Sequence, residues 1–283
     1  MRPQRLRRRL WDKVRLAIYR QLSHSSQIAR LAMHIRRAAT LQVRHRLVDS
    51  MEAEENGEVW LIEMLGPRIE IAFDVGANIG SWSDIVLQRC THLRSLHCYE
   101  PSETAANTIQ ARTENNTHVH LVRAAVSDQE GTALFFEEAG ASQTSSLVRH
   151  GASSTIQRTV PVITVDGEMH RQCIDHLDIL KIDVEGYDLH VLRGAREALK
   201  RQAISVVQFE YNLPWMYAGS TLQAAAVFLA ECNYELLLLN RTGLCRCDIS
   251  RLGELFSYLN FVAIPQSELS LLPTDINPDP LWS

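Results

Sequence analysis

The pattern that most limits the fold is an alternation of short apolar runs with helix-like runs from about Val59 onward. Seven runs have the composition of buried strands: "RIEIAFDV", "LRSLHCYE", "HVHLVRAAV", "HLDILKID", "AISVVQFE", "YELLLLN" and "YLNFVAI". Helical spacing is found near 81–90, 103–112, 187–200 and 221–231. Apolar strands separated by helices predict an α/β fold, with a parallel sheet covered by helices on both faces. The last two runs follow one another without a long helix, which predicts an antiparallel final strand.

The distribution of charge divides the chain further. The formal net charge is −4, but residues 1–50 hold thirteen Lys and Arg against two acidic residues, about +11, which leaves about −15 for the remainder. We therefore expect a basic amphipathic helical arm at 1–50, an α/β domain at 51–265 and a C-terminal tail at 266–283. The arm is expected to be either a solvated extension or a helix that contacts an anionic membrane surface or a partner.

Three other sequence features concern the environment of the chain. The six cysteines form no C-x-x-C pair and no zinc-type spacing, so we expect reduced thiols. The first residues do not resemble a secretory signal, and no run of about 18 apolar residues is present. These features predict a cytoplasmic protein, which the arm could bring to the membrane periphery.

The segment 138–158, rich in Gly, Ala, Ser and Thr, is expected to be a mobile loop of the kind that often forms a lid.

The stretch "IAFDVGANIGSWS" joins the first strand to the first helix, the usual place for a ligand in open α/β sheets. It carries Asp74, Gly76, Asn78 and Gly80 in the pattern D-x-G-x-x-x-G, which is not the dinucleotide fingerprint. Glu100 ends the next strand, where an acidic residue accepts hydrogen bonds from ribose hydroxyls. An acidic turn and an acidic ribose partner favour an adenosine with a charged amino-acid tail, which is S-adenosylmethionine.

The motifs "FDVGANIGSWS", "YEPS", "AAVSDQEG", "SSL", "VITVDG", "LKIDVEGYDLHVLRGA" and "VVQFEYN" occur in this order. In order and spacing they resemble the FkbM-type methyltransferases, from roughly Val59 to Pro265. The resemblance implies a class I, Rossmann-like fold with a mostly parallel seven-stranded sheet. It also implies transfer of a methyl group from S-adenosylmethionine, usually to a hydroxyl of a sugar, glycan or polyketide-like small molecule.

The same resemblance assigns cofactor contacts by position. It implies that Asp74, Gly76, Asn78 and Gly80 line the methionine moiety and that Glu100 holds the ribose. Asp128 is similar to residues beside the adenine, and its alternative role is a turn residue beside Gly131. Ser145 and Ser146 match the "SSL" motif and are expected near cofactor or acceptor.

Carboxylates at strand ends are the candidates for catalysis, because a hydroxyl needs a base or a metal to become a good nucleophile. Asp183 and Glu185 lie two residues apart after a buried strand, and such proximity raises the pKa of one of them. The alternative role of Asp183 is helix capping around Gly186. Glu210 ends the neighbouring strand, and its alternative role is an ion pair with Lys181 or an arginine. His190 is a further candidate base, with surface or packing as its alternative. The three carboxylates could also ligate a divalent metal, which spacing alone does not establish.

Tyr211, Asn212 and Trp215 are expected to line an acceptor pocket or, for Trp215, to pack in the core.

Other functions fit the sequence less well. A nucleic-acid methyltransferase would explain the arginine-rich arm, but the acidic body and the absence of the Asn/Asp-Pro-Pro-aromatic motif make nucleic acid an unlikely partner. A non-catalytic scaffold that binds S-adenosylmethionine is a second alternative, which the intact Asp74, Glu100 and Asp183 disfavour. A dehydrogenase is the weakest, since the dinucleotide glycines are missing.

Overall fold

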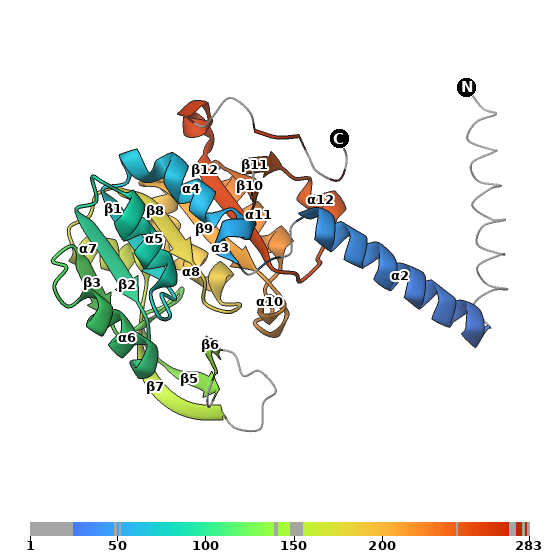
Figure 1. The fold of residues 1–283 in the computed structure, drawn as a ribbon, viewed down its shortest axis with the longest axis horizontal. Helices are drawn as coiled ribbons and strands as arrows, with labels where there is room; N and C mark the ends of the chain where they lie inside the picture. Colours follow the sequence, from blue (N-terminus) through green and yellow to red (C-terminus); the bar gives the residue numbers. More distant parts are fainter. Residues whose placement is uncertain are drawn as a thin grey trace. The chain divides into compact units, whose positions relative to one another are not determined.

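The computed structural model describes residues 25–47, 50, 52–138, 141–147, 155–241, 243–271, 276–278 and 281 (Figure 1). The chain divides into two units, Met1–Arg46 and Leu47–Ser283, and each is described by itself. In the first unit the structure describes helix α2 (Ser26–Leu47), whose last residue belongs to the second unit. No helix in the described ranges has both the length and the hydropathy that crossing a membrane requires.

The second unit is built on an eight-stranded sheet with the strand order β11-β10-β12-β9-β8-β1-β2-β3. Neighbours from β9 to β3 pair in parallel, whereas β12, β10 and β11 pair antiparallel. The strands are β1 (Ile71–Val75), β2 (Ser95–Tyr99), β3 (Val119–Val122), β8 (Leu177–Ile182), β9 (Ile204–Tyr211), β10 (Tyr234–Asn240), β11 (Gly243–Arg246) and β12 (Leu259–Pro265). The predicted class I, Rossmann-like fold is confirmed. Strand β11 is an addition that the apolar pattern did not predict, because it has only four residues.

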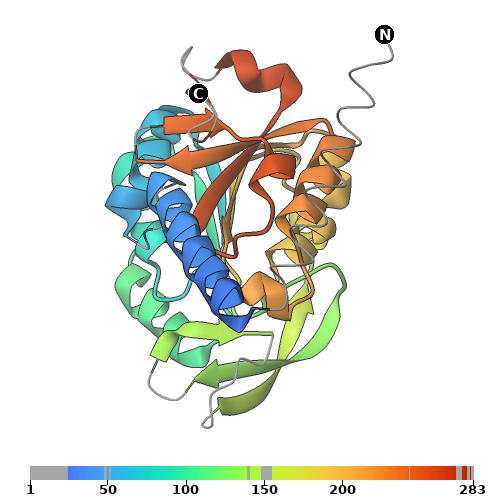
Figure 2. The same cartoon turned by 90° about the vertical axis from the view of Figure 1, so that its right-hand side faces the viewer.

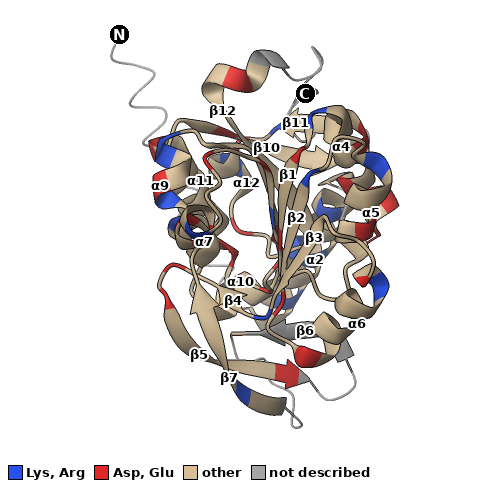
Figure 3. Ribbon diagram, turned by 90° about the vertical axis from the view of Figure 1, so that its left-hand side faces the viewer, with Lys and Arg blue, Asp and Glu red and all other residues tan. Residues whose placement is uncertain are grey.

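Helices cover both faces of this sheet. Figure 3 shows α4, α5 and α6 on one side of the sheet and α7, α9 and α11 on the other. The helices of the second unit are α3 (Ala53–Asn56), α4 (Glu58–Leu65), α5 (Ser81–Arg89), α6 (Glu103–Thr113), α7 (Val165–Arg171), α8 (Asp188–Gly194), α9 (Arg196–Lys200), α10 (Pro214–Tyr217), α11 (Leu222–Glu231) and α12 (Ile249–Leu252), with 3₁₀ turns η1 (Gly66–Arg68) and η2 (Gln266–Leu271). Strands covered on both faces are mainly apolar, as the sequence indicated, and the charged side chains of Asp74 and Lys181 are exceptions.

Local side chains decide where several helices begin and end. Ser102, Thr164 and Thr221 precede α6, α7 and α11, and each hydroxyl accepts a hydrogen bond from the N–H three residues later, at 3.4, 3.0 and 3.1 Å. The helix predicted at 187–200 is interrupted between α8 and α9. Gly194 ends α8 against the carbonyl of Ser127, where a Cβ would collide. The close approach of these two segments requires glycine there.

A second, four-stranded sheet has the order β4-β7-β5-β6 and lies at one end of the first (Figures 1 and 2). Its strands are β4 (Ala125–Val126), β5 (Gly131–Glu138), β6 (Ala141–Ser146) and β7 (Thr155–Ile163). The prediction that 138–158 is a loop was wrong, since 141–146 and 155–158 are strands, whereas 148–154 lie outside the described residues. Small polar residues resemble a loop in composition, yet pairing of β7 with β5 over eight positions satisfies the backbone.

The described part of the tail lies on the edge of the main sheet. Turn η2 begins at Gln266, directly after β12. Further along, the N–H of Asn277 donates to the carbonyl of Leu244 at 2.9 Å, and the N–H of Arg246 donates to the carbonyl of Asn277 at 3.1 Å. These bonds extend the pairing of β11 by one residue of the tail.

Candidate functional site

The turn between β1 and α5 is held tightly against the end of β8. Gly76 has a φ of +78°, and a Cβ at this position would collide with the backbone carbonyl of Asp183. The N–H groups of Gly76 and Ala77 both donate to the carbonyl of Tyr99, at 3.0 and 3.1 Å. Asn78 also has a positive φ, +49°. Glycine at position 76 is therefore required by both conformation and space.

Asp74 lies beneath this turn and is fully buried. The hydroxyl of Ser83 donates to its Oδ2 at 2.6 Å, and the Lys181 Nζ lies 3.7 Å from its Oδ1. Burial raises the pKa of Asp74, while Lys181 opposes this change. A cavity lies at the carboxyl ends of the neighbouring strands, and Asp74 is not among the described residues that line it. Gly80, which caps α5 with a φ of +85°, does not line it either. The contact of Asp74 and Gly80 with the methionine moiety therefore stays a prediction.

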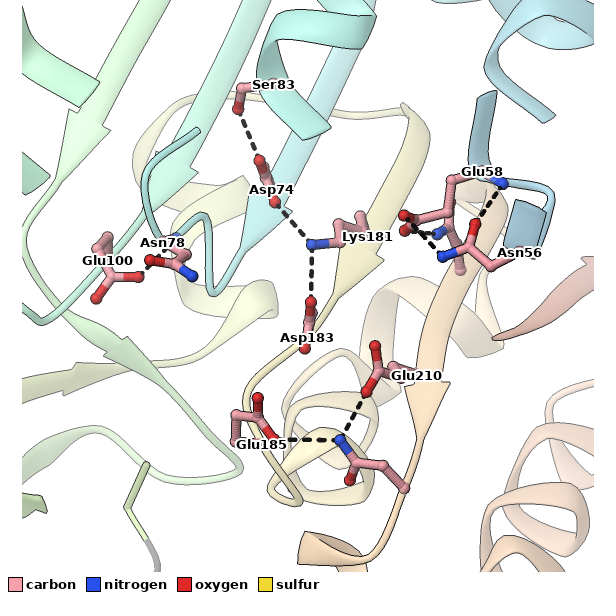
Figure 4. Close-up of polar contacts among 12 residues, drawn as sticks. Asn56, Glu58, Asp74, Asn78, Ser83, Glu100, Lys181, Asp183, Glu185 and Glu210 are labelled. Carbon is pink, nitrogen blue, oxygen red and sulfur yellow. Dashed lines mark hydrogen bonds and ion pairs between the residues drawn. The ribbon is translucent and has the colours of Figure 1, made fainter. Parts of the chain in front are cut away.

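Glu100 follows β2 and faces the same turn (Figure 4). Its Oε2 accepts from the N–H of Asn78 at 2.8 Å, and its Oε1 accepts from the N–H of Ser102 at 2.7 Å. Burial raises the pKa of Glu100 to about 7, against the lowering effect of these two backbone hydrogen bonds. Each carboxylate oxygen has a second lone pair. The group can therefore accept two further hydrogen bonds, which is compatible with the predicted contact with ribose hydroxyls.

Lys181, on β8, occupies the centre of the site. Its Nζ donates to Asp183 Oδ2 at 3.2 Å, in addition to its contact with Asp74. Burial alone would lower the pKa of Lys181, but Asp183, Asp74 and Glu58 together raise it well above its usual value. The suggested ion pair between Lys181 and Glu210 does not form, since Lys181 contacts Asp183 and Asp74 instead.

Glu185 and Glu210 are brought together by one amide. The Asn212 Nδ2 donates to Glu210 Oε1 at 2.7 Å and to Glu185 Oε2 at 3.2 Å (Figure 4). Burial, reinforced by the charge of Asp183, raises the pKa of Glu185 to about 8. Burial followed by the charges of Asp183 and Glu185 raises the pKa of Glu210 well above its usual value. The alternative of helix capping by Asp183 is not seen, because the N–H of Gly186 donates to Asp188.

The three carboxylates do not form a metal site in the described chain. In the described ranges, no group of three or more His, Cys, Asp or Glu side chains has an arrangement that could hold a metal ion.

Glu58, at the start of α4, is a carboxylate of the site that the sequence did not single out. Gln208 Nε2 donates to its Oε1 at 2.6 Å, and Asn56 Nδ2 donates to its Oε2 at 3.2 Å. Burial raises the pKa of Glu58, with Lys181 opposing. The sequence carried a signal for Lys181, because this lysine lies in the apolar run "HLDILKID", which was expected to be a buried strand. A buried ammonium requires carboxylate partners, so the position indicated an ion-paired site. No comparable signal marked Glu58, whose partner Gln208 is 150 residues away.

Asp128 and His190 contact each other instead of the other candidates. The His190 Nδ1 lies 3.2 Å from Asp128 Oδ2, and its ring stacks on Tyr187 at 4.7 Å. Neither residue is among the described residues that line the cavity. Their placement therefore does not support the roles predicted for them. Ser146 belongs to strand β6, but its side chain, like that of Ser145, lies outside the described residues.

Two aromatic candidates belong to the core. Tyr211 and Trp215 are fully buried, and Trp215 Nε1 donates to the carbonyl of Glu210 at 2.9 Å. Tyr211 donates its hydroxyl to Glu254 at 2.7 Å. They hold the end of β9 in place, and neither is among the described residues that line the cavity.

These residues surround one cavity of about 800 Å³ at the carboxyl ends of β1, β2, β8 and β9. The edge of the second sheet borders it through Phe135 and Leu147. Among the described residues that line it, one basic side chain, Lys181, faces eight carboxyl groups: Glu52, Glu54, Glu58, Asp84, Glu100, Asp183, Glu185 and Glu210. Its volume is within the range of small-molecule sites, and its charge favours a ligand with cationic and hydroxyl groups.

Comparison with known proteins gives a family match over most of the main sheet. The profile of the family described as "Methyltransferase FkbM domain" matches residues 74–236. A curated relative, the hexuronic acid methyltransferase AglP of Haloferax volcanii, is 26% identical over 196 residues. That alignment covers 67% of this chain and 69% of the relative.

Solved structures resemble the chain more distantly. The FkbM methyltransferase of Methylobacillus flagellatus KT aligns with a TM-score of 0.45 and 14% identity, covering 69% of this chain and 43% of that one. The chain thus spans less than half of that protein. The precorrin-6y C5,15-methyltransferase of Geobacter metallireducens GS-15 aligns with a TM-score of 0.41 and 12% identity, covering 74% and 88% of the two chains.

Proposed function

Because the chain belongs to the FkbM methyltransferase domain family and is an S-adenosylmethionine-dependent methyltransferase, we propose that it methylates a hydroxyl oxygen of a sugar. The observation that carries this proposal is that one cavity is lined both by Glu100 and the Gly76–Asn78 turn and by the carboxyl groups of Asp183, Glu185 and Glu210. The name of the curated relative supports a sugar as acceptor.

The residues at the turn fit the cofactor. Glu100 would accept hydrogen bonds from the ribose hydroxyls, and the backbone of Gly76 and Asn78 would hold the methionine end. Asn78 Oδ1 is buried without a hydrogen-bond partner among the described residues, so it offers an acceptor to the ligand's amino group. S-adenosylmethionine supplies an activated methyl group when it is bound.

The carboxylates at the other end would orient and deprotonate the acceptor. Asp183, which accepts a hydrogen bond from Lys181, would accept another from a neighbouring hydroxyl of the acceptor. Glu185, with a pKa of about 8, takes the proton as the oxygen–methyl bond forms, because a base is most efficient when its pKa is close to the working pH. Glu210, whose pKa burial raises well above its usual value, lines the same end of the cavity and would contact a neighbouring oxygen of the acceptor. Alignment of the hydroxyl supplies much of the acceleration.

The test separates cofactor binding from turnover. In calorimetric titrations with S-adenosylmethionine, Glu100→Ala should bind at least about tenfold more weakly, the value of one charge-assisted hydrogen bond. Glu103→Ala, an exposed neighbour, is the matched control and should bind normally. Asp183→Asn should bind the cofactor normally and lose most of its methyl transfer to glycan extracts. Normal affinity of the Glu100 variant would refute the ribose assignment, and normal turnover of Asp183→Asn would refute the role of Asp183.

A further inference from the structure

The segment 52–58, which comprises α3 and the first residue of α4, forms a wall of the cavity. Glu52, Ala53, Glu54, Asn56 and Glu58 all line it. The segment precedes residues 74–236, so it lies outside the part of the chain that matches the family. Figure 4 shows Glu58 and Asn56 on the opposite side of Lys181 from Glu100 and Asn78. Lys181 therefore lies between this wall and the carboxylate proposed to hold the ribose.

The Glu58 carboxylate is held in a fixed position. One oxygen accepts from Gln208 and the other from Asn56, at 2.6 and 3.2 Å, and the N–H of Glu58 donates to Asn56 Oδ1 at 3.0 Å. Gly57, between the two residues, has a φ of +96° and packs against the backbone of Asn240, where a Cβ would collide. A carboxylate supported in this way keeps free lone pairs in a defined direction, which is the requirement for recognising a donor.

The charge of this end of the cavity disfavours an anionic acceptor. Glu52, Glu54 and Glu58 stand on the wall, and Asp183, Glu185 and Glu210 stand at the strand ends. Lys181 is the one cation among the described lining residues, and Asp74 and Asp183 already contact it. An acidic group on the acceptor would meet a cluster of acidic side chains here, with no cation left to balance its negative charge. Placing like charges together weakens binding.

A buried donor in the same cavity calls for an acceptor oxygen on the ligand. Trp82, on α5, lines the cavity and is 4% exposed, and its indole N–H has no hydrogen-bond partner among the described residues. An ammonium group cannot accept this hydrogen bond, whereas a hydroxyl can accept from Trp82 and donate to a carboxylate. The cavity thus offers both halves of hydroxyl recognition.

We propose that the segment 52–58 is the acceptor-binding wall and that it selects a sugar without an acidic group, with Glu58 accepting a hydrogen bond from an acceptor hydroxyl. This inference rests on the proposed function, because it names the acceptor class of the same site. It also distinguishes this chain from its relative AglP, which is named as acting on a hexuronic acid.

The experiment separates acceptors by charge before the reaction. A glycan extract is divided by anion exchange into a non-acidic pool and an acidic pool, and each is incubated with full-length protein and S-adenosylmethionine labelled in the methyl group. The wild-type protein should label the non-acidic pool at least about tenfold more. Glu58→Gln should bind the cofactor within twofold of wild type and reduce the preference about tenfold, because it removes one carboxylate charge that an acidic sugar would meet. Glu55→Gln, an exposed neighbour that bonds to Ser50 and does not line the cavity, should keep the preference.

Each outcome distinguishes this inference from the proposed function. Label that enters mainly the acidic pool, or a preference unchanged in Glu58→Gln, overturns the acceptor class while methyl transfer to a sugar stands. Absence of label from both pools, with S-adenosylmethionine bound, overturns the proposed sugar acceptor and this inference with it. A Glu58 variant that fails to melt cooperatively is replaced by Glu54→Gln on the same wall, for which the same reduced preference is expected and an unchanged one counts against the wall.

Discussion

Removal of the Lys181 ammonium should destabilise the protein strongly, because its charge balances the buried carboxylate of Asp74 and the partly exposed carboxylate of Asp183. The Nζ lies 3.2 Å from Asp183 and 3.7 Å from Asp74. At an effective dielectric constant of about 20, Coulomb's law gives roughly 5 kcal/mol for each pair before desolvation is subtracted. Since loss of one partner leaves a buried charge uncompensated, we expect Lys181→Met to lower the free energy of unfolding by about 3–5 kcal/mol.

Thermal and urea unfolding followed by circular dichroism measure this effect. For a unit of this size, the expected loss corresponds to a fall in Tm of about 6–20 °C. Lys200→Met is the matched control, because Lys200 is exposed at the end of α9 and its loss should change stability by no more than about 0.5 kcal/mol. The double variant Asp74→Asn/Lys181→Met should recover part of the loss, since it removes a carboxylate as well.

The dependence on pH has a definite sign. The pKa of Lys181 is raised in the folded state, so its stabilising effect is complete at neutral pH and is lost only as the pH rises through that raised value. Without the ammonium, the pKa of Asp74, already raised by burial, rises further. The difference in free energy of unfolding between wild type and Lys181→Met should therefore decrease as the pH falls and the carboxyl groups bind protons. A loss below about 1 kcal/mol at pH 8, or a gap that widens in acid, would refute this reasoning.

Two other predictions concern pH and the N-terminal helix. The rate of methyl transfer at low acceptor concentration should rise with pH through an apparent pKa near 8, because Glu185 acts in its ionised form. This rise should be absent in Glu185→Gln. A wild-type rate that stays constant from pH 6 to 9 would contradict this role. Helix α2 has five arginines, no acidic residue, and exposed Ile28, Leu31 and Ile35, so the full chain should co-sediment with vesicles containing phosphatidylserine and not with neutral vesicles. Salt-sensitive retention on RNA with no vesicle binding would instead favour a nucleic-acid partner.

The sequence predicted the parts of the site that follow from strand order. Glu100, Asp183 and Glu210 each follow or end a strand, and the carboxyl ends of parallel strands meet at one edge of a sheet. Gly76 was recognisable because a turn at this place needs a positive φ. These residues are positioned by the backbone of neighbouring strands, so local pattern and strand order are enough to place them.

Residues positioned by long-range packing could not be predicted in this way. Glu58 precedes the first strand, and its place in the cavity depends on Gln208 and on the approach of Gly57 to the backbone of Asn240. His190 and Asp128 were chosen separately as chemical candidates, whereas helix α8 brings them to each other. Helical spacing sets the direction of a side chain only once the packing of the helix is known.

The seam between Gly76 and Asp183 has a consequence for how such an enzyme can diversify. The Asp183 carbonyl leaves no room for a Cβ at Gly76. The Asp183 N–H also donates to the carbonyl of Val75 at 2.9 Å. These two contacts hold the first turn and the end of β8 together. A substitution on either side of the seam disturbs both. The segment 52–58 and the second sheet border the same cavity but do not take part in this contact. Substitutions there can therefore change which acceptor is bound while the residues proposed to bind the cofactor stay unchanged.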